Sequence, residues 1–104
     1  MDKVKEYYDN GCKKLLKIIP REDYKLILCY EDSTRLYDLS NELYGVFEIL
    51  KNKEKFFEVF IDEFGCIAWD IDKSVDSSIH WNNRIDICKD SAYISSSEIE
   101  IKKI

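Results

Sequence analysis

The residues that could do chemistry are concentrated between Phe64 and Asp90. This stretch holds both tryptophans, the only histidine, two of the four cysteines and a dense set of aspartates. Tryptophans beside charged groups could bind a planar ligand, and clustered carboxylates could bind a metal ion. A histidine beside a thiol could form a nucleophilic pair. The candidate surface for a ligand or a partner protein consists of Trp69, Asp70, His80, Trp81, Arg84 and Asp86.

The aspartates of residues 70–76 (D-I-D-K-S-V-D) have a spacing that invites comparison with a calcium-binding loop. The sixth loop position is Val75, where the sharp turn needs glycine, and the twelfth is Trp81, where a bidentate glutamate belongs. We therefore expect these carboxylates to cap turns and to pair with Arg84 or with lysines.

His80 is the only histidine, which excludes a metal site with several histidines within one chain. A pair with Cys66 or Cys88 is conceivable, but neither cysteine lies in an activating motif. The four cysteines are scattered, whereas structural zinc sites usually take their ligands in close pairs. The sequence thus predicts no catalytic residue, no metal site and no cofactor.

The two tryptophans have two interpretations. They could line a pocket that stacks a planar ligand, with Arg84 or Arg35 placing a charge over an aromatic face. Alternatively, they are core anchors, because an indole dominates any small core. The core interpretation is favoured for Trp69, at the end of a predicted strand, and both stay open for Trp81, in a polar loop.

Arg84 and Asp86 bracket Ile85, so on a strand they share one face. An arginine–carboxylate pair, formed with neighbouring residues or with Asp70, would fasten the polar loop onto the sheet. We expect both residues to act as structural staples.

Length and composition indicate one globular domain. The chain has 104 residues, of which 45% are hydrophobic and 36% charged, with a formal net charge of −5. An acidic balance argues against direct binding of nucleic acid through phosphates. The chain opens without an apolar signal region and has no apolar run that could span a membrane. We expect a cytoplasmic protein whose thiols are reduced and mostly buried.

The first half of the sequence predicts an antiparallel meander. Strands are expected at 13–19, 24–30 and 34–38, and in the second strand Leu26 and Leu28 alternate with Ile27 and Cys29. Leu15 and Ile19 are assigned to the second face of the first strand.

The second half predicts short helices and a hairpin. Ser40 is expected to cap a short helix that stops at Gly45, and Asn52 to cap another. Strands at 59–62 and 66–69 are expected to form a hairpin across residues 63–65, with Gly65 in the left-handed conformation. Apolar alternation resumes at 85–88, residues 91–97 form a loop with at most a helical turn, and 99–102 fit an edge strand or tail.

These elements predict an α+β fold, a small and mostly antiparallel β-sheet with one or two short helices packed on one face. The expected organisation is an N-terminal arm at 1–11, a single domain at 12–97 and a terminal edge strand or tail at 98–104. Tyr7 and Tyr8 either pack on the domain or belong to a mobile arm.

The chain also resembles domain-of-unknown-function family 2442, a group of small bacterial proteins. The matching positions, over residues 13–97, are Asp23-Tyr24-x-Leu26-x-Leu28 with Tyr30, Arg35-Leu36-Tyr37-Asp38-Leu39, Gly45-Val46-Phe47-x-x-Leu50, Phe56 with Val59, Gly65-x-Ile67-x-Trp69, Asn83-x-Ile85-Asp86-Ile87-Cys88-x-Asp90 and Tyr93. The resemblance implies a small α+β domain with no established activity. Some members of the family carry a helix-turn-helix segment, and others lie beside small genes in arrangements suggestive of toxin–antitoxin pairs.

Two departures from the family pattern matter. Ser33 replaces the glycine that usually follows the second strand, and no helix-turn-helix follows within these 104 residues, so DNA binding is not carried over. The longer segment at 70–82 resembles a tryptophan- and aspartate-rich subset of the family.

The sequence favours a non-catalytic interaction or regulatory domain rather than an enzyme. Its partner would be another protein or a second copy of the chain, because apolar residues occupy both faces of the predicted strands. One alternative is a small-molecule sensor with a pocket near Trp69 and Trp81. Another is an antitoxin-like protein that binds a small toxin.

Overall fold

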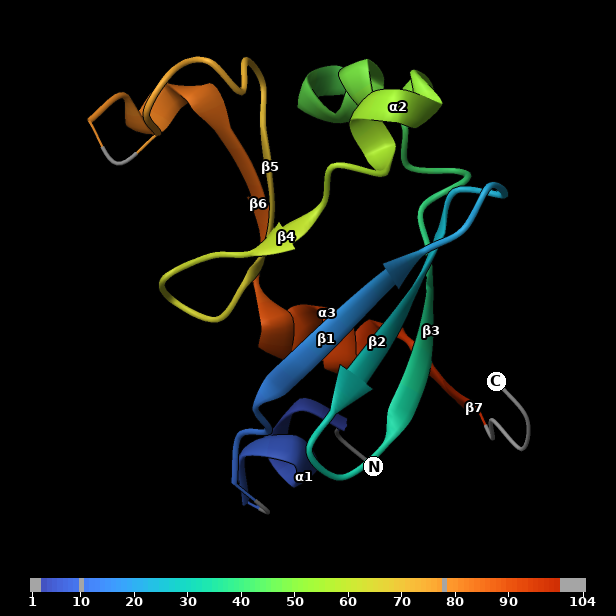
Figure 1. Ribbon diagram of the computed structural model, residues 1–104. Helices are drawn as coiled ribbons and strands as arrows, with labels where there is room; N and C mark the ends of the chain where they lie inside the picture. Colours follow the sequence, from blue (N-terminus) through green and yellow to red (C-terminus); the bar gives the residue numbers. More distant parts are fainter. Residues whose placement is uncertain (1–2, 10, 78, 100–104) are drawn as a thin grey trace.

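The computed structural model describes residues 3–9, 11–77 and 79–99, and the side chains of all these except Lys3, Val4 and Trp81. It confirms the predicted fold class: small antiparallel sheets and short helices form an α+β fold (Figure 1). Residues 100–104, which include part of the predicted C-terminal tail, lie outside the described residues.

The first sheet contains the predicted meander. Its strands are β1 (Leu15–Pro20), β2 (Lys25–Tyr30), β3 (Thr34–Asp38) and β7 (Ser97–Ile99), arranged in the order β1-β2-β3-β7. All neighbours are antiparallel, and β7 pairs only with residues 34–36 of β3. β7 overlaps the predicted C-terminal edge strand or tail at residues 98–99, and it leaves the last residues of β3 without a partner on that side.

The prediction for Leu15 is wrong. A register shift between Leu15 and Lys17 marks a β-bulge in β1, so Leu15 lies opposite Tyr30 and is buried in the core. Because a bulge inserts one extra residue, it reverses the side to which the residues before it point. Ile19 keeps its predicted place on the outer face.

A second sheet holds the predicted hairpin. Its strands are β4 (Phe60–Ile61), β5 (Ile67–Asp70) and β6 (Arg84–Ile87), in the order β4-β5-β6. Gly65 has φ +79, as the predicted glycine-containing turn requires. The hairpin does not extend the meander as one sheet, and β6 completes a separate three-stranded sheet.

The helices partly differ from prediction. The predicted helix capped by Ser40 is absent, because the Asp38 Oδ1 accepts the Ser40 N–H at 2.8 Å and residues 40–41 form a turn. Gly45, with φ +62, begins the 3₁₀ helix η1 (Gly45–Lys51) instead of ending a helix. The prediction for Asn52 is confirmed: its side chain accepts the Glu54 N–H at the start of α2 (Lys53–Phe56).

Both ends of the chain add a helix to the same side of the fold. Residues 91–97, predicted as a loop, lie largely in the helix α3 (Lys89–Ser95). This helix buries Ala92 against the core. The Tyr30 hydroxyl donates a hydrogen bond to the Lys89 carbonyl oxygen at 2.7 Å. The N-terminal helix α1 (Lys3–Asp9) contacts α3, and Tyr7 is 6% exposed. Of the two alternatives for the N-terminal arm, the structure shows packing.

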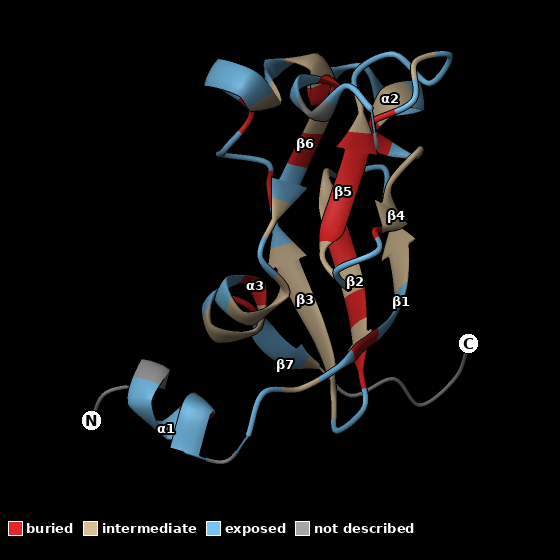
Figure 2. Ribbon diagram, turned by 90° about the vertical axis from the view of Figure 1, so that its left-hand side faces the viewer, coloured by how far each residue is buried: buried red, intermediate tan, exposed pale blue. Residues whose placement is uncertain are grey.

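One core joins the two sheets. Its buried residues are concentrated in β2 and β5, as Figure 2 shows. The fully buried large side chains are Trp69, Phe56, Leu26, Leu28, Leu39, Leu50 and Ile67. The core is therefore formed between the inner face of the first sheet, the second sheet and the segment that contains η1 and α2.

The outer face of the first sheet has an apolar row. Ile19, Ile27 and Leu36 lie opposite one another on β1, β2 and β3, and all three are half-buried. Self-association through this face stays a prediction.

The cysteines do not behave as predicted. None is buried: Cys12 and Cys88 are exposed, and Cys29 and Cys66 are half-buried. Cys29 falls on the outer face of β2, and Cys12 and Cys88 lie in the segments that precede β1 and α3. No helix within the described residues is long and apolar enough to cross a membrane.

Candidate functional site

Trp69 is a core anchor. Its side chain is fully buried and stacks on Phe56 with 6.1 Å between ring centroids. The indole Nε1–H donates a buried hydrogen bond to the Phe56 carbonyl oxygen at 2.9 Å. Trp69 therefore does not line a surface pocket, and the structure supports the core interpretation for it. The side chain of Trp81 is outside the described residues, although its backbone begins η2 (Trp81–Asn83).

Arg84 is a structural staple, as predicted. Its Nε lies 3.5 Å from Asp70 Oδ1 on the neighbouring strand, and its Nη1 forms an ion pair with Glu63 of the β4–β5 hairpin. Asp70 also accepts a hydrogen bond from the Ser77 hydroxyl at 2.6 Å. The pair thus fastens both the hairpin and the polar loop to the second sheet.

The loop between β5 and β6 is organised by Asn83, which sequence reasoning missed. Its side-chain oxygen accepts the Asp72 N–H, and its amide group donates to the carbonyl oxygens of Asp72 and Val75 and to the Ser77 hydroxyl. These hydrogen bonds reach six to eleven residues back along the chain and close a loop that has neither glycine nor proline.

The aspartates of this loop act within turns, as expected. Asp72 Oδ1 accepts hydrogen bonds from both the hydroxyl and the backbone N–H of Ser74. These two hydrogen bonds lower the pKa of the Asp72 carboxyl. Among the described residues no three histidine, cysteine, aspartate or glutamate side chains are grouped so as to hold a metal ion. His80 is exposed on this loop, and its backbone N–H donates to the Asp76 carbonyl oxygen.

Asp86 departs from its predicted role. It is exposed, and no hydrogen bond or ion pair joins its carboxylate to another described residue. It lies opposite Ala68 in the register, whereas Arg84 lies opposite Asp70 and pairs with it. Asp86 therefore does not fasten the loop; it lines a groove between β6 and the end of β3.

This groove, which we call the β3–β6 groove, has a volume of about 600 Å³. It is formed by the end of β3, the segment at 39–47, the end of β6 and the residues around the α3–β7 junction. Its lining residues are Leu36, Tyr37, Asp38, Leu39, Glu42, Tyr44, Phe47, Asp86, Ile87, Ser95 and Ser97. In Figure 2, β6 and β3 follow one another along the side of the molecule on which α3 lies.

The charges of the β3–β6 groove have one sign. Three carboxylates line it, those of Asp38, Glu42 and Asp86, and its described lining residues include no lysine or arginine. The hydrogen bonds from Ser40 lower the pKa of the Asp38 carboxyl, and Lys25, its cross-strand partner outside the groove, lowers that pKa further. The groove is therefore negatively charged at neutral pH.

The Glu42 carboxylate also raises the pKa of the two tyrosines that line the groove. The Tyr44 hydroxyl donates to Glu42 Oε2 at 3.1 Å, and this hydrogen bond raises the pKa of Tyr44. Burial raises the pKa of Tyr37, and the Glu42 carboxylate raises it further. Both hydroxyls thus stay protonated and neutral, so the negative charge of the groove comes from its carboxylates alone.

The groove lies between the open edges of two sheets. β7 covers β3 only as far as Leu36, so Tyr37 and Asp38 have no strand partner on that side. β6 is an edge strand of the second sheet, and Asp86 and Ile87 are its last two residues. Main-chain groups at the end of β3 and along β6 are thus unpaired by any strand on this side.

Sequence reasoning found Asp86 but missed its neighbours in the groove. Asp38 was expected at the end of a strand, and Glu42 and Tyr44 in the short helix after Ser40, so none of the three was given a binding role. The signal that could have found them is the run of acidic and aromatic residues between a strand end and η1.

Comparison of the chain with family models, with curated proteins and with solved structures finds no match. The resemblance to domain-of-unknown-function family 2442 therefore stays a prediction.

Proposed function

We propose that this protein is a non-catalytic interaction domain that binds an extended, basic segment of a partner protein in the β3–β6 groove. The observation that carries this proposal is the lining of the groove: three carboxylates and three aromatic rings, with no lysine or arginine among its described residues. Such a lining is complementary to lysine and arginine side chains, both by charge and through cation–π contacts.

The strand edges support an extended conformation for the bound segment. Main-chain groups at the open edge of a sheet can pair with an added strand, and pockets along the edge then select alternate side chains. The open positions are at the end of β3 and along β6, beside Asp38 and Asp86 respectively. A segment lying there would place every second side chain near a carboxylate.

The aromatic residues support the same ligand. Tyr44 is 67% exposed, so its ring is open to a ligand, and Phe47 packs against the core. A cation held over such rings gains about 0.5–2 kcal/mol, depending on how far it is desolvated.

The overall charge favours this class of partner. A net charge of −5 attracts basic proteins over a distance of about one Debye length and speeds their association. An antitoxin-like role, in which the partner is a small basic toxin, is one form of this function. On the resemblance to family 2442 we place the protein in a bacterial cytosol. Sensing of a small molecule between Trp69 and Trp81 gains no support, because Trp69 is fully buried.

The proposal is tested with labelled peptides of about eight residues, long enough to form one strand. One peptide alternates lysine or arginine with valine or threonine, and its counterpart carries glutamate at the basic positions. Fluorescence anisotropy is expected to show binding of the basic peptide alone, weakening as salt is added.

A triple variant, Asp38→Asn with Glu42→Gln and Asp86→Asn, is expected to weaken binding about tenfold, since each exposed charge pair contributes about 0.2–1 kcal/mol. The matched control removes the same number of charges from exposed residues outside the groove: Glu22→Gln, Glu31→Gln and Glu54→Gln. Failure of the basic peptide to bind, or equal weakening in both variants, would overturn the proposal.

A further inference from the structure

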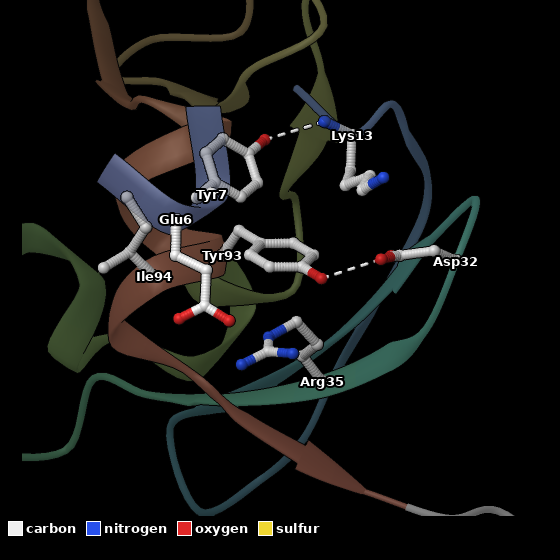
Figure 3. A pocket seen from close by; sticks show the side chains of 7 residues that line it. All are labelled: Glu6, Tyr7, Lys13, Asp32, Arg35, Tyr93 and Ile94. Carbon is white, nitrogen blue, oxygen red and sulfur yellow. Dashed lines mark hydrogen bonds between the residues drawn. The ribbon is translucent and has the colours of Figure 1, made fainter. Parts of the chain in front are cut away.

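A second cavity, of about 530 Å³, lies where α1 meets α3 and the hairpin between β2 and β3. It is lined by Glu6, Tyr7, Lys13, Asp32, Arg35, Tyr93 and Ile94, and we call it the α1 pocket. Figure 3 shows Glu6 and Ile94 on one side of it, Lys13 and Asp32 on the other, and Tyr93 reaching across toward Asp32. Its volume falls in the range of cavities that bind small molecules.

Fixed aromatic side chains form the frame of the α1 pocket. The rings of Tyr7 and Tyr93 have centroids 4.7 Å apart, and the Tyr7 hydroxyl donates to Asp90 Oδ1 at 2.5 Å. The same hydroxyl accepts the Lys13 N–H at 2.8 Å, as the upper dashed line of Figure 3 marks. The N-terminal helix is thus fastened in place, and the pocket it closes is preformed.

Arg35 is the best placed cation in the pocket. Its guanidinium lies over the Tyr93 ring at 4.2 Å, and its side chain is only 14% exposed. Its Nε and Nη2 donate to the Ser96 hydroxyl and carbonyl oxygens. Its Nη1 lies 3.7 Å from Glu98 Oε1, beyond hydrogen-bond distance, and makes no hydrogen bond with the described residues. A largely desolvated donor group therefore remains available to a ligand.

Two carboxylates oppose this cation. Asp32 Oδ2 accepts the Tyr93 hydroxyl at 2.7 Å, and hydrogen bonds from Tyr93 and Ser33 keep the Asp32 pKa low although burial raises it. The Glu6 carboxylate is exposed and has no hydrogen bond or ion pair with a described residue. Two acidic and two basic side chains thus line the pocket, so its formal charge is balanced.

A balanced but divided charge selects a ligand that carries both signs. An anion would be repelled by the two carboxylates and a cation by Arg35 and Lys13, whereas a zwitterion can satisfy both sides. We infer that the α1 pocket binds a small zwitterion of the α-amino-acid class, with its carboxylate at Arg35 Nη1 and its ammonium group at Glu6. The Tyr93 ring and Ile94 provide the apolar surface against which the side chain of the ligand rests.

Calorimetric titration of the full chain with a panel of the standard amino acids tests this inference. At least one is expected to bind with a Kd of about 1 mM or tighter, the range accessible to a ligand of so few atoms. For that amino acid, the analogue without the carboxylate and the analogue without the amino group are each expected to bind at least about tenfold more weakly, because each loses a charge-assisted hydrogen bond. Binding of either analogue as tight as that of the parent would overturn the inference, as would the absence of binding across the panel.

Two single substitutions locate the site. Glu6→Gln is expected to weaken binding about two- to fivefold, because Glu6 is exposed and an exposed charge pair contributes little. Since Glu6 has no partner among the described residues, the variant should fold normally. Glu48→Gln is the matched control, with unchanged affinity expected, because Glu48 is an exposed glutamate that does not line the pocket. Equal affinity of the wild type and the Glu6→Gln variant would place the ligand elsewhere and overturn the inference.

Discussion

Asp38, the last residue of β3, and Asp86, on β6, line one groove although their strands belong to two different sheets. Neither strand continues its sheet on the side of the groove, so two unpaired edges and two carboxylates face the same space. This relationship connects the fold to the proposed function. An interaction domain needs an open edge and a complementary charge, and both result here from the way the two small sheets meet.

Replacing Trp69 by alanine is expected to lower the free energy of unfolding by about 3–5 kcal/mol, because the change leaves a cavity in the core. It also leaves the Phe56 carbonyl oxygen without its buried hydrogen-bond donor. Urea denaturation at neutral pH measures the change. The control is Phe64→Ala, since Phe64 is an aromatic residue that is 79% exposed and should cost about 0.5 kcal/mol or less. Similar losses for the two variants would contradict the core assignment.

Asn83→Ala is expected to destabilise the protein by about 2 kcal/mol or more. The change leaves the Asp72 N–H and the Val75 carbonyl oxygen without the partner that the loop supplies. Asn82→Ala is the control, because Asn82 is the adjacent residue, has the same side chain and is exposed. Hydrogen exchange should show faster exchange at residues 71–77 in the Asn83 variant alone. Unchanged exchange there would show that Asn83 does not organise the loop.

The contact between Tyr7 and Asp90 predicts a pH-dependent stability. Burial raises the pKa of Asp90, but hydrogen bonds from Lys89 and Tyr7 outweigh it and hold the pKa below its ordinary value of 3.8. Because the folded-state pKa is depressed, Asp90 stabilises the fold fully at pH values above 3.8, and this contribution is lost as the pH falls through the folded-state pKa.

Tyr7→Phe should therefore destabilise the protein more at neutral pH than in acid, where the carboxyl is protonated. Urea denaturation at a series of pH values measures the difference. Tyr8→Phe is the control, because Tyr8 is the neighbouring tyrosine and is 51% exposed. A cost of Tyr7→Phe that does not change with pH would contradict the assigned contact.

The sequence predicted the local elements of this fold better than their assembly. The alternation of Leu26 and Leu28 with Ile27 and Cys29 was sufficient to place β2 and its buried face, and the glycine at 65 to place a hairpin. The bulge in β1 could not be predicted, because no glycine or proline marks it, and Leu15 was therefore assigned to the wrong face. The separation into two sheets was also missed, since it depends on contacts between distant segments.

The candidate site shows the same division. The types of Arg84 and Asp70 and the strand spacing around Ile85 predicted that Arg84 would fasten the loop, and the structure brings Arg84 and Asp70 together. Asp86 has the same spacing from Ile85 but finds no cation, because its cross-strand partner is Ala68. The groove residues Asp38 and Glu42 are distant from Asp86 in sequence and carry no motif. The edge beside Asp38 is open because β7 begins at Ser97, opposite Leu36, and does not cover the last residues of β3.

The most direct measurement of the central claim is the mapping of backbone amide chemical shifts while the basic peptide is titrated into the labelled protein. The account predicts that the shifts change most at Tyr37, Asp38, Asp86 and Ile87, with little change on the outer face at Ile19 and Ile27. Changes confined to other surfaces, or no change at saturating peptide, would contradict it.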